Sequence, residues 1–271
     1  MAPLFDRFRK SGIAPAGAIR LYYWQGVPNL GDQVAEVIVR ELSRRPVTVV
    51  GKRDRRKLIA CGSTIHRARR GDIIWGAGTL HRDQVPASRA VSVRAVRGPL
   101  TREIVIDAGI DCPEVYGDPG LLLPEVRPLT RAESPRFSLG VIPHYQDKGR
   151  VTSDDPRVAI LDIQGALEPF LEVLLDCERV VSSSLHGMIF AEAYGIPALE
   201  LRIGDDVRGA AHKFEDYFAG TGRSRPAPIT LDTLMTEGVQ PVPVIDPALR
   251  RSFPFPPNPT PTPVRPPDTR A

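Results

Sequence analysis

Short apolar runs alternate with amphipathic segments along most of this chain, and this alternation restricts its fold more than any other feature. In the first half, runs rich in Val, Ile and Leu are bounded by turn residues, as expected of strands buried on both faces of a parallel sheet. The expected strands are residues 19–23, 47–50, 58–61, 73–75 and 91–96. Strands separated by helical patterns indicate an α/β fold with parallel strands.

The clearest helical pattern begins after Asn29. Asn is a good N-cap, and after it Val34, Val37, Ile38 and Leu42 recur at helical spacing. A second helix is expected over residues 99–108, because its proline at position 99 suits a first helical turn.

The prolines and charges of residues 124–135 predict a linker between two units. Beyond it we expect strands at 137–142, 158–163, 179–182 and 197–203, with helices at 165–177 and 185–194. The predicted fold is therefore α/β, with two Rossmann-like domains, 15–128 and 136–248, facing a cleft. In such folds a ligand binds between the carboxyl ends of the strands. Residues 253–271, rich in Pro and Thr, are expected to be disordered or extended along the surface.

Residues 180–197 suggest a site that holds an anion. They are expected to form a buried strand end, a turn of three serines and a helix whose first turn carries His186. Ser182, Ser183 and Ser184 can cap the amides of that helix, and amides and helix dipole together attract phosphate or carboxylate. His186 would then lie beside the anion with a ring that donates a proton near neutral pH. An ordinary N-cap before a core helix explains the segment equally well.

Two glycine-containing motifs also follow expected strands. In Asn29-Leu-Gly-Asp32, Gly31 permits close backbone approach, and Asn29 and Asp32 offer polar groups at a helix N-terminus. A simple N-cap followed by a charge that suits the helix dipole is the commoner explanation. Trp75-Gly-Ala-Gly-Thr79, with Gly78 and Thr79, could cradle an anion or a sugar, but it lacks the full dinucleotide-binding spacing.

Three single residues occupy similar positions at strand ends. Arg97 could pair with a carboxylate or phosphate, although an arginine at a helix entrance is often a surface residue. Asp118 lies in a turn, where it could cap the backbone or accept from a sugar hydroxyl. His144 closes the strand expected at 137–142 and would face the cleft. The shared placement of these motifs at strand ends favours a common site.

The composition is that of an ordinary globular protein and excludes several classes. Lys and Arg exceed Asp and Glu by 36 to 32, with basic runs at 52–57 and 67–70. We expect these runs to form solvated faces without nucleic-acid binding, with attraction to an anionic membrane surface as an alternative. The three cysteines show neither disulfide nor metal-ligand spacing, and no signal peptide or membrane span is recognised. A cytoplasmic location, with contact at the inner face of the plasma membrane as an option, is expected.

Taken in order, the motifs resemble those of the polysaccharide pyruvyltransferase family over residues 21–222. They are Asn29-Leu-Gly-Asp32, Gly76-Ala-Gly-Thr79, Val96-Arg-Gly-Pro99, Tyr116-Gly-Asp-Pro119, Val141-Ile-Pro-His144, Ser183-Ser-Leu-His-Gly187 and Lys213-Phe-Glu-Asp-Tyr217. The resemblance implies a GT-B-like architecture, with the first domain on the acceptor side and the second on the donor side. It implies transfer of pyruvate from phosphoenolpyruvate, used as a substrate without any cofactor, to two hydroxyls of one sugar. The products would be a cyclic ketal and phosphate, and the acceptor a bacterial exopolysaccharide or its lipid-linked precursor at the inner membrane.

The same resemblance assigns roles to individual residues. His186 becomes the candidate acid and phosphate neighbour, and Arg97 the clamp for the carboxylate or phosphate. His144 and Asp118 become candidates for acceptor contact or general base, and Lys213 adds charge toward the donor. The remaining residues expected to contact substrate are Asn29, Gly31, Asp32, Gly78, Thr79, Ser183 and Ser184.

One departure from the family leaves other functions open. Many relatives place a basic residue directly before the Leu-His pair, where this chain has Ser184. A nucleotide-sugar glycosyltransferase on the same fold is the alternative enzyme, although no DxD metal motif is present. The pairs at 154–155 and 205–206 are expected in solvated loops. The other alternative is a non-catalytic protein of polysaccharide assembly.

Overall fold

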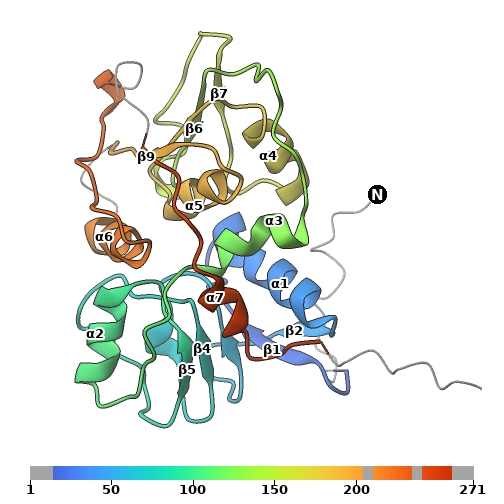
Figure 1. The fold of residues 1–271 in the computed structure, drawn as a ribbon, viewed down its shortest axis with the longest axis vertical. Coiled ribbons are helices and arrows are strands. Elements are labelled where there is room, and N and C mark those ends of the chain that lie inside the picture. Colours follow the sequence, from blue (N-terminus) through green and yellow to red (C-terminus); the bar gives the residue numbers. More distant parts are fainter. Residues whose placement is uncertain (1–14, 204–209, 234–239, 258–271) are drawn as a thin grey trace, which may run out of the picture.

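The computed structural model describes residues 15–203, 210–233 and 240–257, and its core is two parallel β-sheets (Figure 1). The first sheet has the strand order β2-β1-β3-β4-β5 and the second the order β7-β6-β8-β9. Every pairing within the two sheets is parallel. The predicted α/β class with parallel strands in both halves is confirmed.

The first sheet contains all five strands expected from the first half of the sequence. They are β1 (Ile19–Tyr22), β2 (Val47–Val49), β3 (Leu58–Ile59), β4 (Ile73–Trp75) and β5 (Ser92–Ala95). Helix α1 (Leu30–Ser43) begins after Asn29, whose side chain accepts a hydrogen bond from the Asp32 amide, so the predicted N-cap is confirmed. Helix α2 (Pro99–Asp107) begins at the expected proline.

The second sheet follows the sequence prediction with shorter strands. Its strands are β6 (Leu139–Ile142), β7 (Val158–Ile160), β8 (Val180–Ser182) and β9 (Ala198–Glu200). Two predicted helices are present as α4 (Leu167–Leu174) and α5 (Leu185–Ala193). Helix α6 (Ala210–Gly220) was not predicted, and α3 (Leu123–Val126) occupies the start of the expected linker. Single turns of 3-10 helix add η2 (Ile65–Arg67), η3 (Pro119–Leu122), η4 (Tyr145–Asp147) and η5 (Leu231–Thr233).

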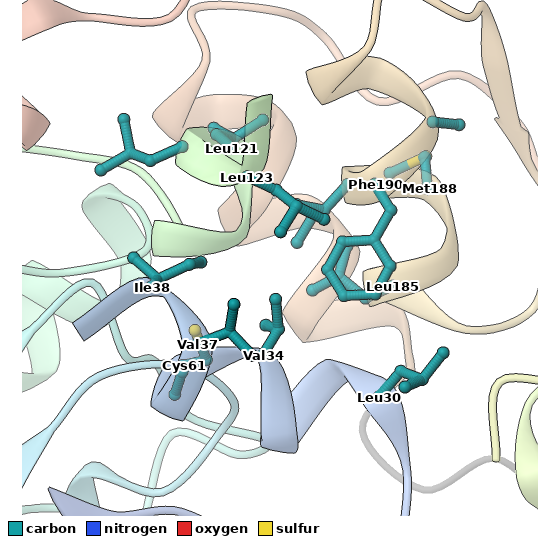
Figure 2. Packing of buried hydrophobic residues seen from close by; sticks show 14 of the residues in the cluster. Leu30, Val34, Val37, Ile38, Cys61, Leu121, Leu123, Leu185, Met188 and Phe190 are labelled. Atoms are coloured by element: carbon teal, nitrogen blue, oxygen red, sulfur yellow. The ribbon is translucent and has the colours of Figure 1, made fainter. Parts of the chain in front are cut away.

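One hydrophobic cluster joins the two halves (Figure 2). Leu30 and Val34 of α1 belong to the same buried cluster as Leu121 and Leu123 of the connecting segment and Phe190 of α5. Burying a large apolar side chain stabilises a fold by about 1.5–3 kcal/mol, so this shared packing fixes α1 against α5. The first turns of these two helices carry Asp32 and His186.

The C-terminal segment returns to the first sheet. Helix α7 (Pro247–Arg251) lies beside that sheet in Figure 1, and the indole N–H of Trp75 donates to the Leu249 carbonyl and the Ser252 hydroxyl, both at 3.1 Å. The Phe253 ring lies 4.8 Å from the Trp75 ring and is buried. Phe253 is therefore a core residue, unlike the surface tail expected from position 253 onward. Residues 258–271 lie outside the described part of the chain.

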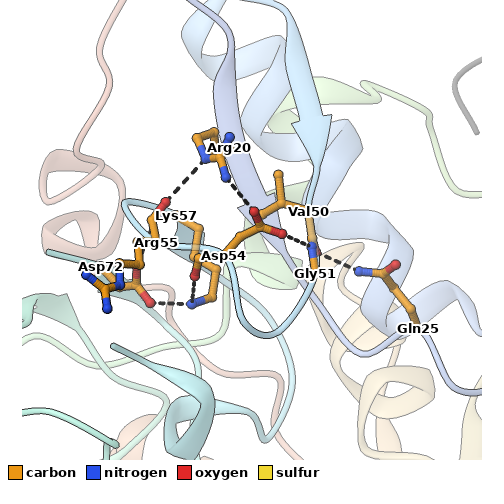
Figure 3. Close-up of polar contacts among 8 residues, drawn as sticks. All are labelled: Arg20, Gln25, Val50, Gly51, Asp54, Arg55, Lys57 and Asp72. Atoms are coloured by element: carbon orange, nitrogen blue, oxygen red, sulfur yellow. Dashed lines mark hydrogen bonds and ion pairs between the residues drawn. The ribbon is translucent and has the colours of Figure 1, made fainter. Parts of the chain in front are cut away.

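A buried ion pair ties β3 to the turn before β4 (Figure 3). The Asp72 carboxylate accepts from the Lys57 ammonium and from the amides of Lys57 (3.1 Å) and Arg69 (2.8 Å). Both side chains of the pair are 0% exposed. The expected solvated face is therefore wrong at Lys57, because its charge pairs inside the protein.

Replacing Asp72 by Asn should destabilise the fold strongly. The Lys57 ammonium would remain buried without its counter-charge, which typically costs about 3–5 kcal/mol. Denaturant unfolding of Asp72→Asn against the native protein measures this loss. Glu103→Ala is the control, because Glu103 pairs with Arg82 on the surface and exposed pairs contribute about 0–1 kcal/mol. Equal losses in the two variants would contradict the structural role of the buried pair.

Candidate active site

A cavity of about 340 Å³ is lined by segments that follow strands of both sheets. Segments after β1, β3, β4 and β5 contribute from one side, and segments after β6, β7 and β8 contribute from the other. This is where parallel sheets place their ligands. Of the residues predicted from sequence, the cavity is lined by Asn29, Asp32, Arg97, Asp118, His144, Ser184, His186 and Lys213. The other predicted residues do not line the cavity but contact residues that do. They are Gly31, Gly78, Thr79 and Ser183.

His186 and Asp118 face each other from different halves. His186 Nε2 lies 3.4 Å from Asp118 Oδ2, and neither atom has a hydrogen-bond partner among the residues that the structure describes. The other carboxylate oxygen of Asp118 accepts from the Gly120 amide at 2.9 Å, which fixes the side chain. The carboxylate occupies the Nε2 side of the imidazole, which leaves Nδ1 as the ring nitrogen available to a substrate.

Gly31 makes room for the His186 ring. A Cβ atom at position 31 would lie 2.2 Å from His186 Nδ1 and 2.3 Å from Cγ. Any larger residue would therefore push the imidazole away from Asp118. The close approach predicted for Gly31 is present, and its partner is a side chain of the second half.

The serine turn differs from the prediction. Ser184 is the N-cap residue of α5, but its side chain makes no capping hydrogen bond. The Ser182 hydroxyl donates to the carbonyls of Ile142 and Ser184 and accepts from the Ser184 amide. The Ser183 hydroxyl donates to Asp147 (2.7 Å) and accepts from the His144 amide (2.8 Å). The serines therefore build the turn without capping α5. Its N-terminus faces the cavity with no side-chain cap, which suits an anion.

Asn29 and Asp32 form a reciprocal pair at the start of α1. The Asn29 amide donates to the Asp32 carboxylate, and the Asp32 backbone N–H donates to Asn29 Oδ1 at 3.1 Å. Burial raises the pKa of Asp32 to about 6, while nearby His186 and the Asn29 hydrogen bond act in the opposite direction. A carboxylate with this pKa is ionised at pH 7 and is a better proton acceptor than an ordinary Asp.

Arg97 is tied into the structure by three hydrogen bonds. Its Nε donates to Asp216 Oδ2 on α6 (3.0 Å), Nη1 to Ser63 Oγ (2.8 Å) and Nη2 to the Thr79 carbonyl (2.7 Å). A Cβ atom at position 78 would lie 2.4 Å from Arg97 Cζ, so Gly78 is needed for this placement. Because Asp216 neutralises the guanidinium, Arg97 links the two halves. Its role as an anion clamp stays a prediction that depends on its remaining N–H groups.

Thr79 also links the two halves. Its hydroxyl lies 2.9 Å from Nε2 of His212 on α6. This contact holds α6, and with it Lys213, against the loop that follows β4.

Lys213 brings a positive charge to the cavity. It is buried, and it has no hydrogen-bond or ion-pair partner within the described part of the chain. Its Nζ lies 5.6 Å from the Phe214 ring. Burial and the charge of Arg97 lower the pKa of Lys213 to about 8, partly opposed by Glu200, Asp32 and Asp147. Lys213 is therefore mostly charged at pH 7 and is placed to bind an anion.

His144 is a poor base in this structure. Burial, with the nearby charges of Lys213 and His186, lowers the pKa of His144 to about 3. Its Nδ1 accepts from the Gln146 amide at 3.3 Å, and its ring packs against Tyr145. A neutral imidazole can still donate through Nε2, so contact with a substrate is the role that fits it.

Among the lining residues that the sequence analysis missed are three polar ones that follow β3. Thr64, His66 and Arg67 lie on and before η2, directly after β3, and line the cavity. Each of the three has a buried polar atom without a hydrogen-bond partner in the described part of the chain, namely Thr64 Oγ1, His66 Nδ1 and Arg67 Nε. Arg67 was expected on a solvated basic face. The signal for its role was the Cys61-Gly-Ser-Thr64 turn at a strand end, not the charge run.

Cys61, Asp118 and His186 are close enough to hold a metal ion. Their ligand atoms lie within 4.8 Å of one another. Burial and the charges of Asp118 and Asp32 raise the pKa of the Cys61 thiol well above its usual value, which disfavours the thiolate that metals bind. Cys112 and Cys177 are also free and buried. Asp155 pairs with Arg157 at the surface, and residues 205–206 lie outside the described residues.

Within the described residues, no helix is long and apolar enough to cross a membrane.

The sequence of the chain matches a known protein family. The sequence model of the polysaccharide pyruvyl transferase family matches residues 29–199. An uncharacterized protein of Acanthamoeba polyphaga mimivirus is 34% identical over 173 residues, which cover 60% of this chain and 60% of that relative's length. No solved structure matches. The matched region runs from the N-cap of α1 to beyond the end of α5, and it therefore includes Asp32, the η2 turn, Asp118 and His186.

Proposed function

The chain belongs to the polysaccharide pyruvyl transferase family, and from this premise we propose that it transfers pyruvate from phosphoenolpyruvate to two hydroxyls of one sugar. The products are a cyclic pyruvyl ketal and phosphate. The acceptor is a sugar of a bacterial exopolysaccharide or of its lipid-linked precursor. The observation that carries this proposal is a cavity that combines the His186–Asp118 pair with Lys213 and Arg67, two cations for which the described residues offer no carboxylate partner.

In this proposal the two sheets are the Rossmann-like halves of a GT-B-like enzyme. The first half faces the acceptor, and the second half faces the donor. The chemistry takes place between them, where the first turns of α1 and α5 are held together by the shared hydrophobic cluster. A lipid-linked acceptor would be modified at the cytoplasmic face of the membrane.

The lining charges suit a donor with a phosphate and a carboxylate. Lys213 and Arg67 have no carboxylate partner among the described residues, and the start of α5 has no side-chain cap. Ser184 stands where many relatives have a basic residue. Arg67 and Lys213, which enter from other elements, supply the positive charge that position 184 lacks.

We assign the proton transfers of this reaction to His186 and Asp32. His186 Nδ1 gives its proton to C3 of phosphoenolpyruvate, so the methylene becomes a methyl group and C2 becomes electrophilic. The first hydroxyl adds to C2 and its proton passes to Asp32. The second hydroxyl then forms a bond to C2 as the bond between C2 and the phosphate oxygen breaks. Its proton returns to His186, and Asp32 passes its proton to the departing phosphate.

Donor binding tests the proposal without knowledge of the acceptor. In calorimetric titrations we expect phosphoenolpyruvate to bind and nucleotide sugars to bind weakly or not at all. Arg67→Gln should weaken binding about ten- to hundredfold, because a charge-assisted hydrogen bond contributes about 1.5–3 kcal/mol. Arg70→Gln is the matched control, because Arg70 belongs to the same basic run and is exposed.

The other outcomes separate the alternatives. Preferential binding of a nucleotide sugar would replace pyruvyl transfer by glycosyl transfer. Binding of neither donor, with no phosphate released in the presence of sugars, would favour a non-catalytic role in polysaccharide assembly.

A further inference from the structure

Trp24 is an exposed aromatic residue at the edge of the cavity. It follows β1, lines the cavity and keeps 41% of its surface exposed. The other tryptophan of the chain, Trp75, is 0% exposed and has its indole N–H hydrogen-bonded. Exposing an indole to water forgoes the free energy of burying it. Its position beside the cavity suggests that a ligand covers it.

The loop that carries Trp24 is held in place on both sides. Gly26 lies against the indole, since a Cβ atom there would lie 2.2 Å from Trp24 Cζ2. The Gln25 side chain donates to the Val50 carbonyl at 2.8 Å (Figure 3). At the end of the loop, Gln164 of the second half donates to the Pro28 carbonyl at 3.2 Å. The indole is therefore positioned before any ligand arrives, which lowers the entropic cost of binding.

The groups near Trp24 in the chain select the kind of ligand. Asn29 and Asp32, a few residues further on, line the same cavity with an amide and a carboxylate. A flat apolar surface beside hydrogen-bonding groups matches a pyranose ring, which has an apolar C–H face and an edge of hydroxyls. Phosphoenolpyruvate has no such face. Tyr145 also lines the cavity, but its ring packs against His144 at 4.2 Å.

We propose that Trp24 is the platform on which the acceptor sugar stacks, with the reacting hydroxyls directed toward Asp32. This assignment rests on the proposed pyruvyl transfer and names the acceptor side of the same cavity. It accounts for an exposed tryptophan in a loop whose conformation is fixed.

Fluorescence gives a direct test because the chain has only two tryptophans and Trp75 is buried. The probes are methyl pyranosides of glucose, galactose, mannose and glucuronic acid, titrated to high millimolar concentration with and without phosphoenolpyruvate. At least one should shift the emission to shorter wavelength as the sugar displaces water from Trp24. That shift should be absent in Trp24→Phe, which retains Trp75. By calorimetry Trp24→Ala should weaken binding of the same sugar about tenfold or more, and Trp24→Phe less.

The outcomes distinguish this inference from the proposed function. If phosphoenolpyruvate binds normally to the native protein and to Trp24→Ala, but no sugar changes the emission, the platform is refuted and pyruvyl transfer stands. If a sugar shifts the emission but phosphoenolpyruvate does not bind, the platform stands and the donor is wrong. Equal sugar affinity of Trp24→Ala and the native protein would also refute the platform.

Discussion

His186→Gln should lower kcat about a hundred- to ten-thousandfold, which is the usual contribution of a positioned general acid. Gln keeps a polar side chain of similar length but cannot deliver a proton to C3. The affinity for phosphoenolpyruvate should change much less than kcat, because Lys213 and Arg67 remain. Phosphate release with an acceptor, combined with calorimetry of donor binding, separates the two quantities.

Two further variants show whether this loss belongs to the His186–Asp118 pair. His81→Gln changes an exposed histidine outside the cavity and should leave kcat unchanged. Asp118→Asn removes the charge 3.4 Å from Nε2 and should lower kcat while the thermal unfolding midpoint stays near that of the native protein. If His186→Gln retained more than about a tenth of native kcat, another group would have to be the acid.

The sequence predicted the position of the site better than the partners of its residues. Strand ends can be recognised from apolar runs, and parallel sheets bring those ends together, so His186, Asp118 and Asp32, which the sequence predicts to share a site, do line one cavity. The ion pair of Arg97 could not be predicted in this way. Its counter-charge is Asp216, 119 residues further along the chain, on a helix whose pattern was not recognised. Local sequence cannot show that a strand-end arginine is already neutralised.

Charge runs were misleading for a related reason. Lys57 and Arg67 belong to basic stretches that suggested solvated faces, yet one is paired in the interior and the other lines the cavity. The exposure of Phe253 was mispredicted for the same reason. Its Pro-rich context predicts an exposed side chain, whereas packing against Trp75 buries it. In each case the deciding contact is made by a residue distant in sequence, so composition within a window could not reveal it.

The affinity for phosphoenolpyruvate should fall as the pH rises through 8. Burial lowers the pKa of Lys213 to about 8, so the free protein loses this charge above that pH. A bound anion favours the protonated form and raises the pKa of Lys213 in the complex. The complex then holds more protons than the free protein, and linkage requires weaker binding at higher pH, by up to about tenfold per pH unit. Asp32, with a pKa of about 6, is already ionised in this range and does not contribute to the trend.

Substitutions at position 213 test whether Lys213 causes this pH dependence of donor affinity. Lys213→Arg keeps the positive charge to high pH, so its affinity should be nearly constant from pH 7 to 9.5. Lys213→Met removes the charge, so binding should be weak and independent of pH over the same range. Calorimetry of the native protein near pH 8.5 in two buffers with different ionisation enthalpies should reveal proton uptake on binding. Constant native affinity across this range, without proton uptake, would mean that the donor anion does not contact Lys213, and Arg67 with the start of α5 would then have to hold it.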